Sequence, residues 1–311
     1  MKRKVSLIGP STLMVSLPSK WVKQFNVKKG DEIDIEEDDH KLVISLGHSS
    51  VSKKIKIDLI KHQNLIRKLL LNAYRAGFDE INITFGQLED LKTIQHFIST
   101  VLLGFEIIEQ GKNTCTLRNV TKESEEEFES MFRRTFQVTS IMLKNGLEAL
   151  KHHDIELIKE TTLMETTNNK FVLFCERLLN KKGVGNFLKT NFTFAAVYQL
   201  EKIADELKYI FDYISEHSIK ISADVVKFYE KVNMSFDLCQ SAFYDFTEEK
   251  AEEISSIKEK ILLSSESLYN TANKNEACII GRLINIMQFI HNILNCTVPM
   301  HLDKMPQESH C

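Results

Sequence analysis

Short alternations of apolar and polar residues open the chain. Val5 and Leu7 alternate with the polar residues Lys4 and Ser6, and three further segments of residues 1–46 repeat this period of two. Their apolar positions are Leu13, Val15 and Leu17, then Ile33 and Ile35, then Leu42 and Ile44. Because a period of two is typical of half-buried strands, the pattern predicts four short β-strands.

The segments between these strands carry helix and turn signals. Pro18 and Ser19 precede a short helix that we expect over residues 20–25. Lys28–Asp31 contains a glycine and Asp38–His40 is polar, so each segment predicts a turn. A unit this small, built from hairpins, cannot bury enough apolar surface to be stable alone. We therefore expect a second copy of the chain to complete it.

The order of these pieces resembles the SpoVT/AbrB swapped-hairpin DNA-binding module. The shared order is strand, glycine turn, strand ending in proline, short helix, Lys-Lys-Gly-Asp, strand, acidic turn and strand, within residues 1–48. The resemblance implies that two chains interleave their hairpins into one barrel. It also implies a homodimer that binds DNA.

Basic residues gather in this first segment. Residues 1–30 contain seven Lys or Arg and no Asp or Glu, although the whole chain has a net charge of −3. Cationic side chains bind the phosphates of nucleic acids, and a dimer would bring two such clusters together. The candidate DNA-binding residues are Arg3, Lys4, Lys20, Lys23, Lys28 and Lys29. Lysine lacks the bidentate fork of arginine, so we expect contact with the DNA backbone and weak sequence specificity.

Residues 53–119 alternate between strand and helix patterns. The expected strands contain Ile55 and Ile57, then Ile81, Ile83 and Phe85, then Phe105–Glu109 and Thr114–Leu117. The expected helix faces are Leu59, Ile66, Leu70 and Ala73, ended by Gly77, and Leu88, Leu91, Ile94, Ile98 and Val101, ended by Gly104. This alternation predicts a small α/β connector domain.

From Thr121 onward the apolar residues recur at helical steps of three and four. We expect six helices, over residues 123–151, 155–181, 186–217, 222–247, 249–271 and 275–297. Asp154 stands where a helix N-cap belongs. The third and sixth helices repeat each other at a constant offset of 80, in the pairs Leu200/Ile280, Ile203/Leu283, Leu207/Met287, Ile210/Ile290 and Ile214/Leu294. The repeat predicts two three-helix units in tandem.

The run LEKIADELKYIFDYI in the third helix resembles the signature helix of PhoU, the phosphate-uptake regulator family. Glu176–Leu179 falls where the second helix of that family has its Arg-x-Leu. The resemblance covers about residues 121–298 and implies two similar three-helix bundles. The whole layout is similar to that of archaeal proteins that join a SpoVT/AbrB module to a PhoU-like region.

The PhoU resemblance also implies a candidate metal site. Glu201 and Asp205 lie one helical turn apart, and the family uses such carboxylates to hold metal ions. At the offset of 80 they correspond to Gly281 and Asn285, so the second unit lacks both carboxylates. One interpretation is a divalent cation at Glu201 and Asp205, and the other is a solvated acidic face with Lys202 and Lys208 as neighbours. No other cofactor is expected.

Composition places the chain among globular proteins. Of its 311 residues, 43% are hydrophobic and 27% charged. Its six cysteines form no Cys-x-x-Cys pair and the start lacks a secretory signal, so we expect free thiols in a cytoplasmic protein. No uninterrupted apolar run reaches the length of about 18 residues that favours a membrane-spanning helix. Scattered Cys and His residues and the lack of a Gly-x-Ser-x-Gly run do not indicate an enzyme.

Together these patterns predict a multidomain α+β protein. Its expected parts are a SpoVT/AbrB-like swapped-hairpin barrel over 1–48, an α/β connector over 53–119, PhoU-like tandem three-helix bundles over 121–298 and a flexible tail over 299–311. The resemblances imply a homodimeric, DNA-binding regulator of phosphate uptake. The alternative is a signalling adaptor that acts on the ATPase of a phosphate importer or on a sensor kinase, while the barrel serves only for dimerisation.

Overall fold

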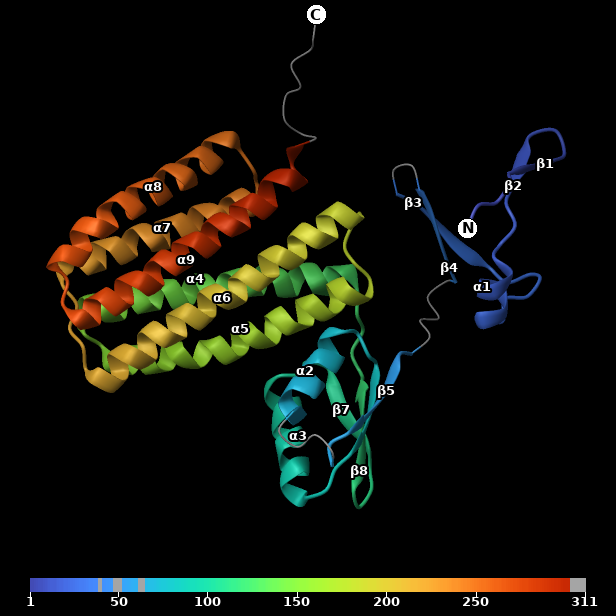
Figure 1. Ribbon diagram of the computed structural model, residues 1–311, viewed down its shortest axis with the longest axis horizontal. Helices are drawn as coiled ribbons and strands as arrows, with labels where there is room; N and C mark the ends of the chain where they lie inside the picture. The colour runs from blue at the N-terminus through green and yellow to red at the C-terminus, as the bar shows by residue number, and fades with distance from the viewer. Residues whose placement is uncertain (39–40, 47–51, 61–64, 303–311) are drawn as a thin grey trace, which may run out of the picture. The chain divides into compact units, whose positions relative to one another are not determined.

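A computed structural model describes residues 1–38, 41–46, 52–60 and 65–302 (Figure 1). The chain divides into two compact units, residues 1–51 and 52–311. The first is a small, strand-rich unit, and the second joins an α/β domain to a large helical region.

The amino-terminal unit contains two antiparallel hairpins and one short helix. Strand β1 (Ser6–Ile8) pairs with β2 (Thr12–Met14), and β3 (Ile33–Asp38) pairs with β4 (Lys41–Leu46). Helix α1 (Ser19–Gln24) lies between the hairpins in sequence. The four strands and the helix expected from the sequence are thus confirmed. Of the second expected turn, residues 39–40 lie outside the described residues.

The α/β domain is a four-stranded sheet with two helices on one side of it (Figure 1). Its strands are β5 (Lys54–Asp58), β6 (Glu80–Thr84), β7 (Phe105–Gln110) and β8 (Thr114–Asn119), and its helices are α2 (Ile66–Arg75) and α3 (Leu88–Thr100). The strand order is β5-β6-β8-β7, with β5 and β6 parallel and β8 antiparallel to both of its neighbours.

The core of this domain follows from the alternation along its strands. In the register of the sheet Ile81 lies opposite both Ile55 and Leu117. Ile81 and Leu117 are fully buried in one cluster with Leu70 and Tyr74 of α2. The sequence assignment of Leu59 to a helix face is wrong, because α2 begins at Ile66. Leu59 instead extends the strand region, where its backbone N–H donates to the carbonyl of Thr84 at 2.8 Å.

Residues 125–297, all of which the structure describes, form six helices. They are α4 (Glu125–His152), α5 (Ile155–Lys181), α6 (Phe187–His217), α7 (Ala223–Tyr244), α8 (Glu248–Thr271) and α9 (Lys274–Thr297). The six expected helices are confirmed to within a few residues at each end. Asp154 is confirmed as an N-cap, because its carboxylate accepts the Leu157 N–H at 3.0 Å.

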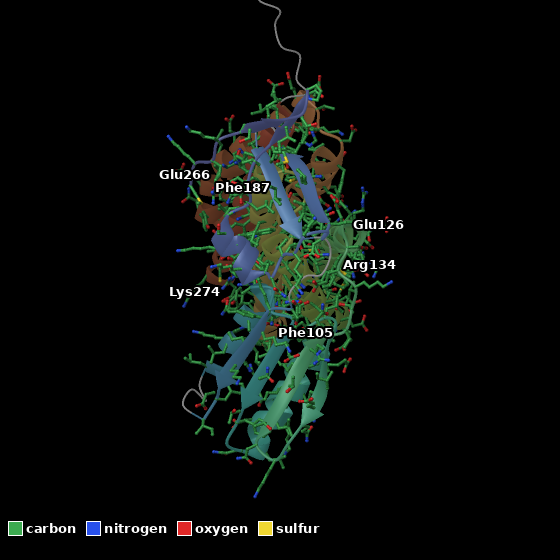
Figure 2. All side chains as sticks on the ribbon, turned by 90° about the vertical axis from the view of Figure 1, so that its right-hand side faces the viewer. Phe105, Glu126, Arg134, Phe187, Glu266 and Lys274 are labelled. Atoms are coloured by element: carbon green, nitrogen blue, oxygen red, sulfur yellow. The ribbon has the colours of Figure 1, made fainter. Side chains whose placement is uncertain are left out.

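The repeated helices α6 and α9 pack against each other. The apolar positions that recur at the offset of 80 are all buried, from Leu200 and Ile280 to Ile214 and Leu294. Gly146 of α4 permits a close approach at the same core, because a Cβ there would lie 2.4 Å from the Phe211 ring. Outside the core, exposed charged side chains such as Glu126, Arg134 and Glu266 project from the helices (Figure 2).

Helix α9 is also the one stretch of described residues that is long and apolar enough to cross a membrane. Its apolar side chains, among them Ile279, Leu283 and Ile290, are instead buried in the helical region. A core helix of a soluble protein has the same length and composition. After α9, Val298–Met300 form a 3-10 helix, and His301 stacks on Phe246 with 5.3 Å between the ring centroids.

Candidate nucleic-acid interface and the junction of the second unit

The predicted DNA-binding cations lie on and around helix α1. Lys20 and Lys23 are separated by three positions on α1 and therefore share one face of it. Helix α1 ends in a compact turn, because Asn26 has a left-handed φ of 52° and Val27 N–H donates to the Val22 carbonyl at 3.0 Å. This turn leads directly to the remaining lysines, Lys28 and Lys29.

The first hairpin brings the basic amino terminus toward the same helix. In its antiparallel register Ser6 lies opposite Met14, so the residues before β1 lie beside the exit of β2. That exit leads through Pro18 into α1. Arg3 and Lys4 therefore lie at the end of the hairpin from which α1 starts.

The charges in this region are available to a ligand. All six predicted DNA-binding residues are exposed. The described residues offer no acidic partner to Lys20, Lys23 or Lys29. The nearest acid in sequence, Asp31, is engaged in the turn, where its carboxylate accepts the Lys28 backbone N–H at 2.7 Å. An anion with several negative groups, such as a nucleic-acid backbone, matches an unpaired cationic surface of this kind.

The described residues of the same unit form no buried core. No residue of 1–46 whose exposure the structure describes is buried. The apolar residues that alternate along its strands are open to solvent, with 64% of Leu7, 69% of Leu13, 56% of Ile35 and 64% of Leu42 exposed. Exposed apolar surface on this scale marks an interaction site in a soluble protein.

The predicted metal ligands contact a lysine. The Lys202 ammonium lies 2.9 Å from Asp205 and 3.8 Å from Glu201. Burial raises the pKa of the Glu201 carboxyl above its ordinary value. Among the described residues no group of three or more His, Cys, Asp or Glu side chains could hold a metal ion. This arrangement does not fit a divalent cation, because among the described residues Glu201 and Asp205 gather no third His, Cys, Asp or Glu ligand.

A buried arginine joins the helical region to the α/β domain. Arg177 of α5 has 1% of its side chain exposed and lies 2.9 Å from Asp79 and 2.7 Å from Glu123. It also donates to the carbonyls of Tyr74 and Phe78, at 3.0 and 2.7 Å. Lys181, one turn further along α5, contacts both carboxylates as well. Two cations and two anions thus balance at this site, which we call the junction.

Aromatic rings complete the junction. The Arg177 guanidinium lies 5.1 Å from the centroids of both Tyr74 and Phe105, whose rings meet edge to face. Figure 2 labels Phe105 on the α/β domain. Such cation–π contacts stabilise a guanidinium that has been removed from water.

The junction also reaches the point at which the second unit begins. One carboxylate oxygen of Asp79 accepts from Arg177, and the other accepts the Lys53 backbone N–H at 3.1 Å. The Lys53 carbonyl in turn accepts the Asp79 N–H at 2.7 Å. Asp79 therefore links helix α5 to the residue at which the chain enters the α/β domain from the amino-terminal unit.

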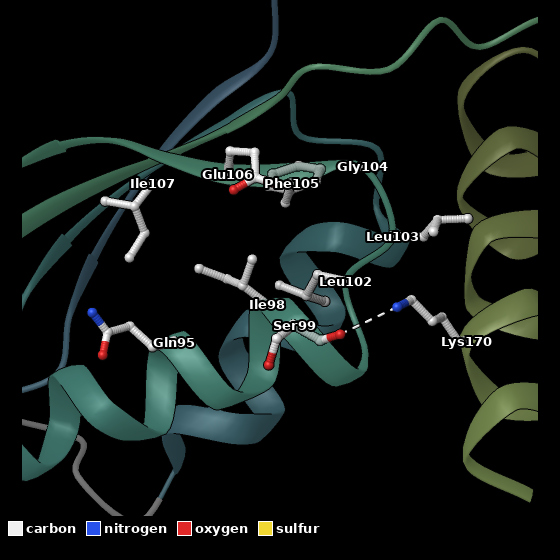
Figure 3. A pocket seen from close by; sticks show the side chains of 10 residues that line it. All are labelled: Gln95, Ile98, Ser99, Leu102, Leu103, Gly104, Phe105, Glu106, Ile107 and Lys170. Carbon is white, nitrogen blue, oxygen red and sulfur yellow. Dashed lines mark hydrogen bonds between the residues drawn. The ribbon is translucent and has the colours of Figure 1, made fainter.

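Two further contacts lie beside the junction. Glu176, 1% exposed, pairs with Arg75 of α2 at 2.5 Å, and burial raises the pKa of its carboxyl to about 7 although Arg75 opposes the shift. Lys170 of α5 reaches the end of α3, where it donates to the Ser99 carbonyl at 3.2 Å beside a cavity of about 420 Å³ (Figure 3).

Sequence reasoning missed the role of these residues, although a signal was present. Glu176 and Arg177 interrupt an apolar run, Phe171–Cys175 followed by Leu178 and Leu179. Charged residues are almost never fully buried unless they are paired. A charged pair within an apolar helical run therefore indicates partners on another part of the chain.

Comparison with known protein families finds a match in the amino-terminal part of the chain. Residues 7–55 match the family described as antidote-toxin recognition MazE, bacterial antitoxin. This match agrees with the AbrB-like part of the sequence interpretation. No curated protein matches the chain.

Proposed function

We propose that the protein is a homodimeric, DNA-binding regulator. The observation that carries the proposal is a combination found among the described residues of 1–46: alternating apolar positions without a core, next to cations without acidic partners. A second copy would cover the apolar surface and double the basic one. The match to a bacterial antitoxin family supports DNA binding or antitoxin-type regulation.

The proposed mode of binding is electrostatic. Lys20 and Lys23 on α1 and Lys28 and Lys29 in the following turn contact phosphates, with Arg3 and Lys4 beside them. Lysine ammonium groups position a protein on the backbone and carry little base information. Binding is therefore strong at low salt and weak in sequence preference.

The finer proposal concerns phosphate. The likeness of residues 121–298 to PhoU and the buried repeat in α6 and α9 support a regulator of phosphate uptake, working in the cytoplasm without catalysis of its own. The junction supplies a route by which the helical region could act on the DNA-binding unit, from α5 through Arg177 and Asp79 to Lys53. Such coupling requires two states with different contacts.

The test is DNA affinity measured by fluorescence anisotropy across a salt series. In the variant that combines Lys23→Ala and Lys29→Ala, two phosphate contacts are lost in each chain. We expect affinity to fall at least roughly tenfold and the slope of log K against log salt to flatten by about two to four. The matched control combines Lys260→Ala and Lys274→Ala, two exposed lysines of the helical region, and should bind as the wild type does.

The adaptor interpretation remains the second candidate, because residues 31–311 are acidic while only the first 30 are basic. An adaptor that uses the first unit only for dimerisation would not retard DNA at moderate salt. An unchanged salt slope in the Lys23 and Lys29 variant, or no DNA binding by the wild-type dimer, contradicts the regulator and favours the adaptor.

A further inference from the structure

A second cleft, of about 520 Å³, opens between the α/β domain and the helical region. Its walls come from α2 and α3 on one side and from α5 and α6 on the other. A volume of this size is typical of small-molecule sites. Because one wall belongs to the α/β domain and the other to the helical region, a ligand here would contact both of the parts that Arg177 joins.

One part of the cleft presents hydrogen-bond acceptors that lack donors. The Asn169 amide donates its N–H to Glu165 at 2.6 Å, and a carboxylate can only accept, so the orientation of the amide is fixed. Its oxygen is then buried with no partner in the described part of the chain. Glu201 lines the same cleft with 18% of its side chain exposed, and the Lys202 ammonium, 3.8 Å away, is beyond hydrogen-bond distance of it. The charge of Arg75 also acts on this carboxyl. A buried acceptor without a donor is costly, and an ammonium group carries three donors.

Other lining residues present cations. Arg67 of α2 has no acidic partner among the described residues. The Lys170 ammonium donates one N–H to the Ser99 carbonyl (Figure 3), and two further N–H groups remain for a ligand. A guanidinium and an ammonium together favour a carboxylate.

Apolar side chains line the remainder of the cleft. They include Phe97 of α3, half-buried, and Leu173 of α5, which is 4% exposed and belongs to the core of the α/β domain. An apolar substituent of the ligand would be removed from water on contact with this surface, which favours binding.

We propose that this cleft binds a free amino acid with a large apolar side chain. Its ammonium lies at Asn169 and Glu201, its carboxylate at Arg67 and Lys170, and its side chain against Phe97 and Leu173. Binding is a property of the second unit and goes beyond the proposed function. Only the role of the ligand, as an effector that changes DNA affinity through the junction, rests on that function.

The experiment is isothermal titration calorimetry on the full-length protein with L-leucine, L-phenylalanine and L-methionine. We expect at least one of them to bind with a dissociation constant of roughly 10 μM to 1 mM. For L-leucine, 3-methylbutylamine lacks the carboxylate and 4-methylpentanoate lacks the amine, and each should bind at least about tenfold more weakly than the parent. No binding by any of the three amino acids overturns the proposal. So does equal binding by either truncated probe, or tighter binding of inorganic phosphate.

Two variants locate the site. Glu201→Gln and Arg67→Ala should each weaken amino-acid binding at least about tenfold, by removing a partner of the ammonium or of the carboxylate. Matched controls on the same or a neighbouring helix are Glu160→Gln and Lys68→Ala, whose side chains are exposed and do not line the cleft. Arg67 is itself exposed, so its replacement leaves the fold intact. Unchanged affinity in Arg67→Ala places the ligand elsewhere and overturns the assignment.

A parallel anisotropy measurement separates this inference from the proposed function. If the amino acid binds and DNA does not, the cleft assignment stands and the DNA-binding regulator fails. If DNA binds and no amino acid does, the reverse holds. If both bind and the amino acid leaves DNA affinity unchanged, the site is upheld and its role as an effector site is overturned.

Discussion

The two units of the chain satisfy their apolar residues in opposite ways. In the second unit the periodic positions of the helices, such as Leu200 and Ile280, are fully buried within the chain. In the first unit the periodic positions of the strands, such as Leu13 and Leu42, are 69% and 64% exposed. The same kind of pattern thus indicates internal packing in one unit and an interface in the other.

The units also differ in how they use charge. At the junction Arg177 and Lys181 are matched by Asp79 and Glu123 and removed from water. On α1, Lys20 and Lys23 are exposed and have no acidic partner among the described residues. Paired charge in the second unit holds parts of one chain together, and unpaired charge in the first is available to another molecule.

The largest effect is expected at the junction. Arg177→Ala leaves Asp79 and Glu123 with Lys181 as their one cationic partner among the described residues, and it removes the guanidinium that contacts the rings of Tyr74 and Phe105. Breaking a buried ion pair on one side costs about 3–5 kcal/mol, so we expect the free energy of unfolding of the full chain to fall by that amount in urea denaturation. Arg134→Ala, an exposed arginine of α4, is the control and should change it by less than about 0.5 kcal/mol. If both replacements lowered the free energy of unfolding equally, the paired charges of the junction would not stabilise the chain more than exposed charges do.

The next largest effect is expected at the exposed leucines of the first unit, which the proposed dimer would bury. Leu13→Asp places a charge on a surface that the proposed dimer buries, so the dimer should weaken at least about a hundredfold in sedimentation velocity. Leu263→Asp is the matched control, since Leu263 is 79% exposed on α8 in the unit that has its own core. It should leave the association state unchanged. Dissociation by Leu263→Asp but not by Leu13→Asp would move the interface to the helical region.

The sequence predicted the local elements well and the long-range contacts poorly. The boundaries of α4–α9 follow from a three-to-four period and from caps such as Asp154, which depend on neighbouring residues alone. Leu59 was misplaced because an apolar residue next to a strand fits a strand extension and a helix start equally well. Arg177 and Asp79 are 98 positions apart, and no local pattern pairs them. The cleft, built from four helices, could not be predicted for the same reason.

The smallest expected effect concerns pH and Glu176. Its pKa is about 7 in the fold against about 4.5 in the unfolded chain, so between these values the folded state retains a proton that the unfolded state has released. Stability from this group is therefore present at low pH and is lost as pH rises toward about 7. Glu176→Gln does not titrate. The stability of the wild type relative to this variant should fall by about 2.5 kcal/mol between about pH 5 and 8.

Thermal or urea unfolding at several pH values measures this difference. Glu160→Gln on the exposed face of α5 is the control and should show the pH dependence of the wild type. A stability difference between wild type and Glu176→Gln that rises with pH would contradict the burial argument.

The central claim is that the amino-terminal unit is completed by a second chain. The most direct measurement is the mass of the full-length protein in dilute solution, by light scattering after size-exclusion chromatography at micromolar concentration. The account predicts twice the chain mass of 35.9 kDa. A mass of one chain, with amide hydrogen exchange still showing protected hairpins in residues 1–46, would contradict it.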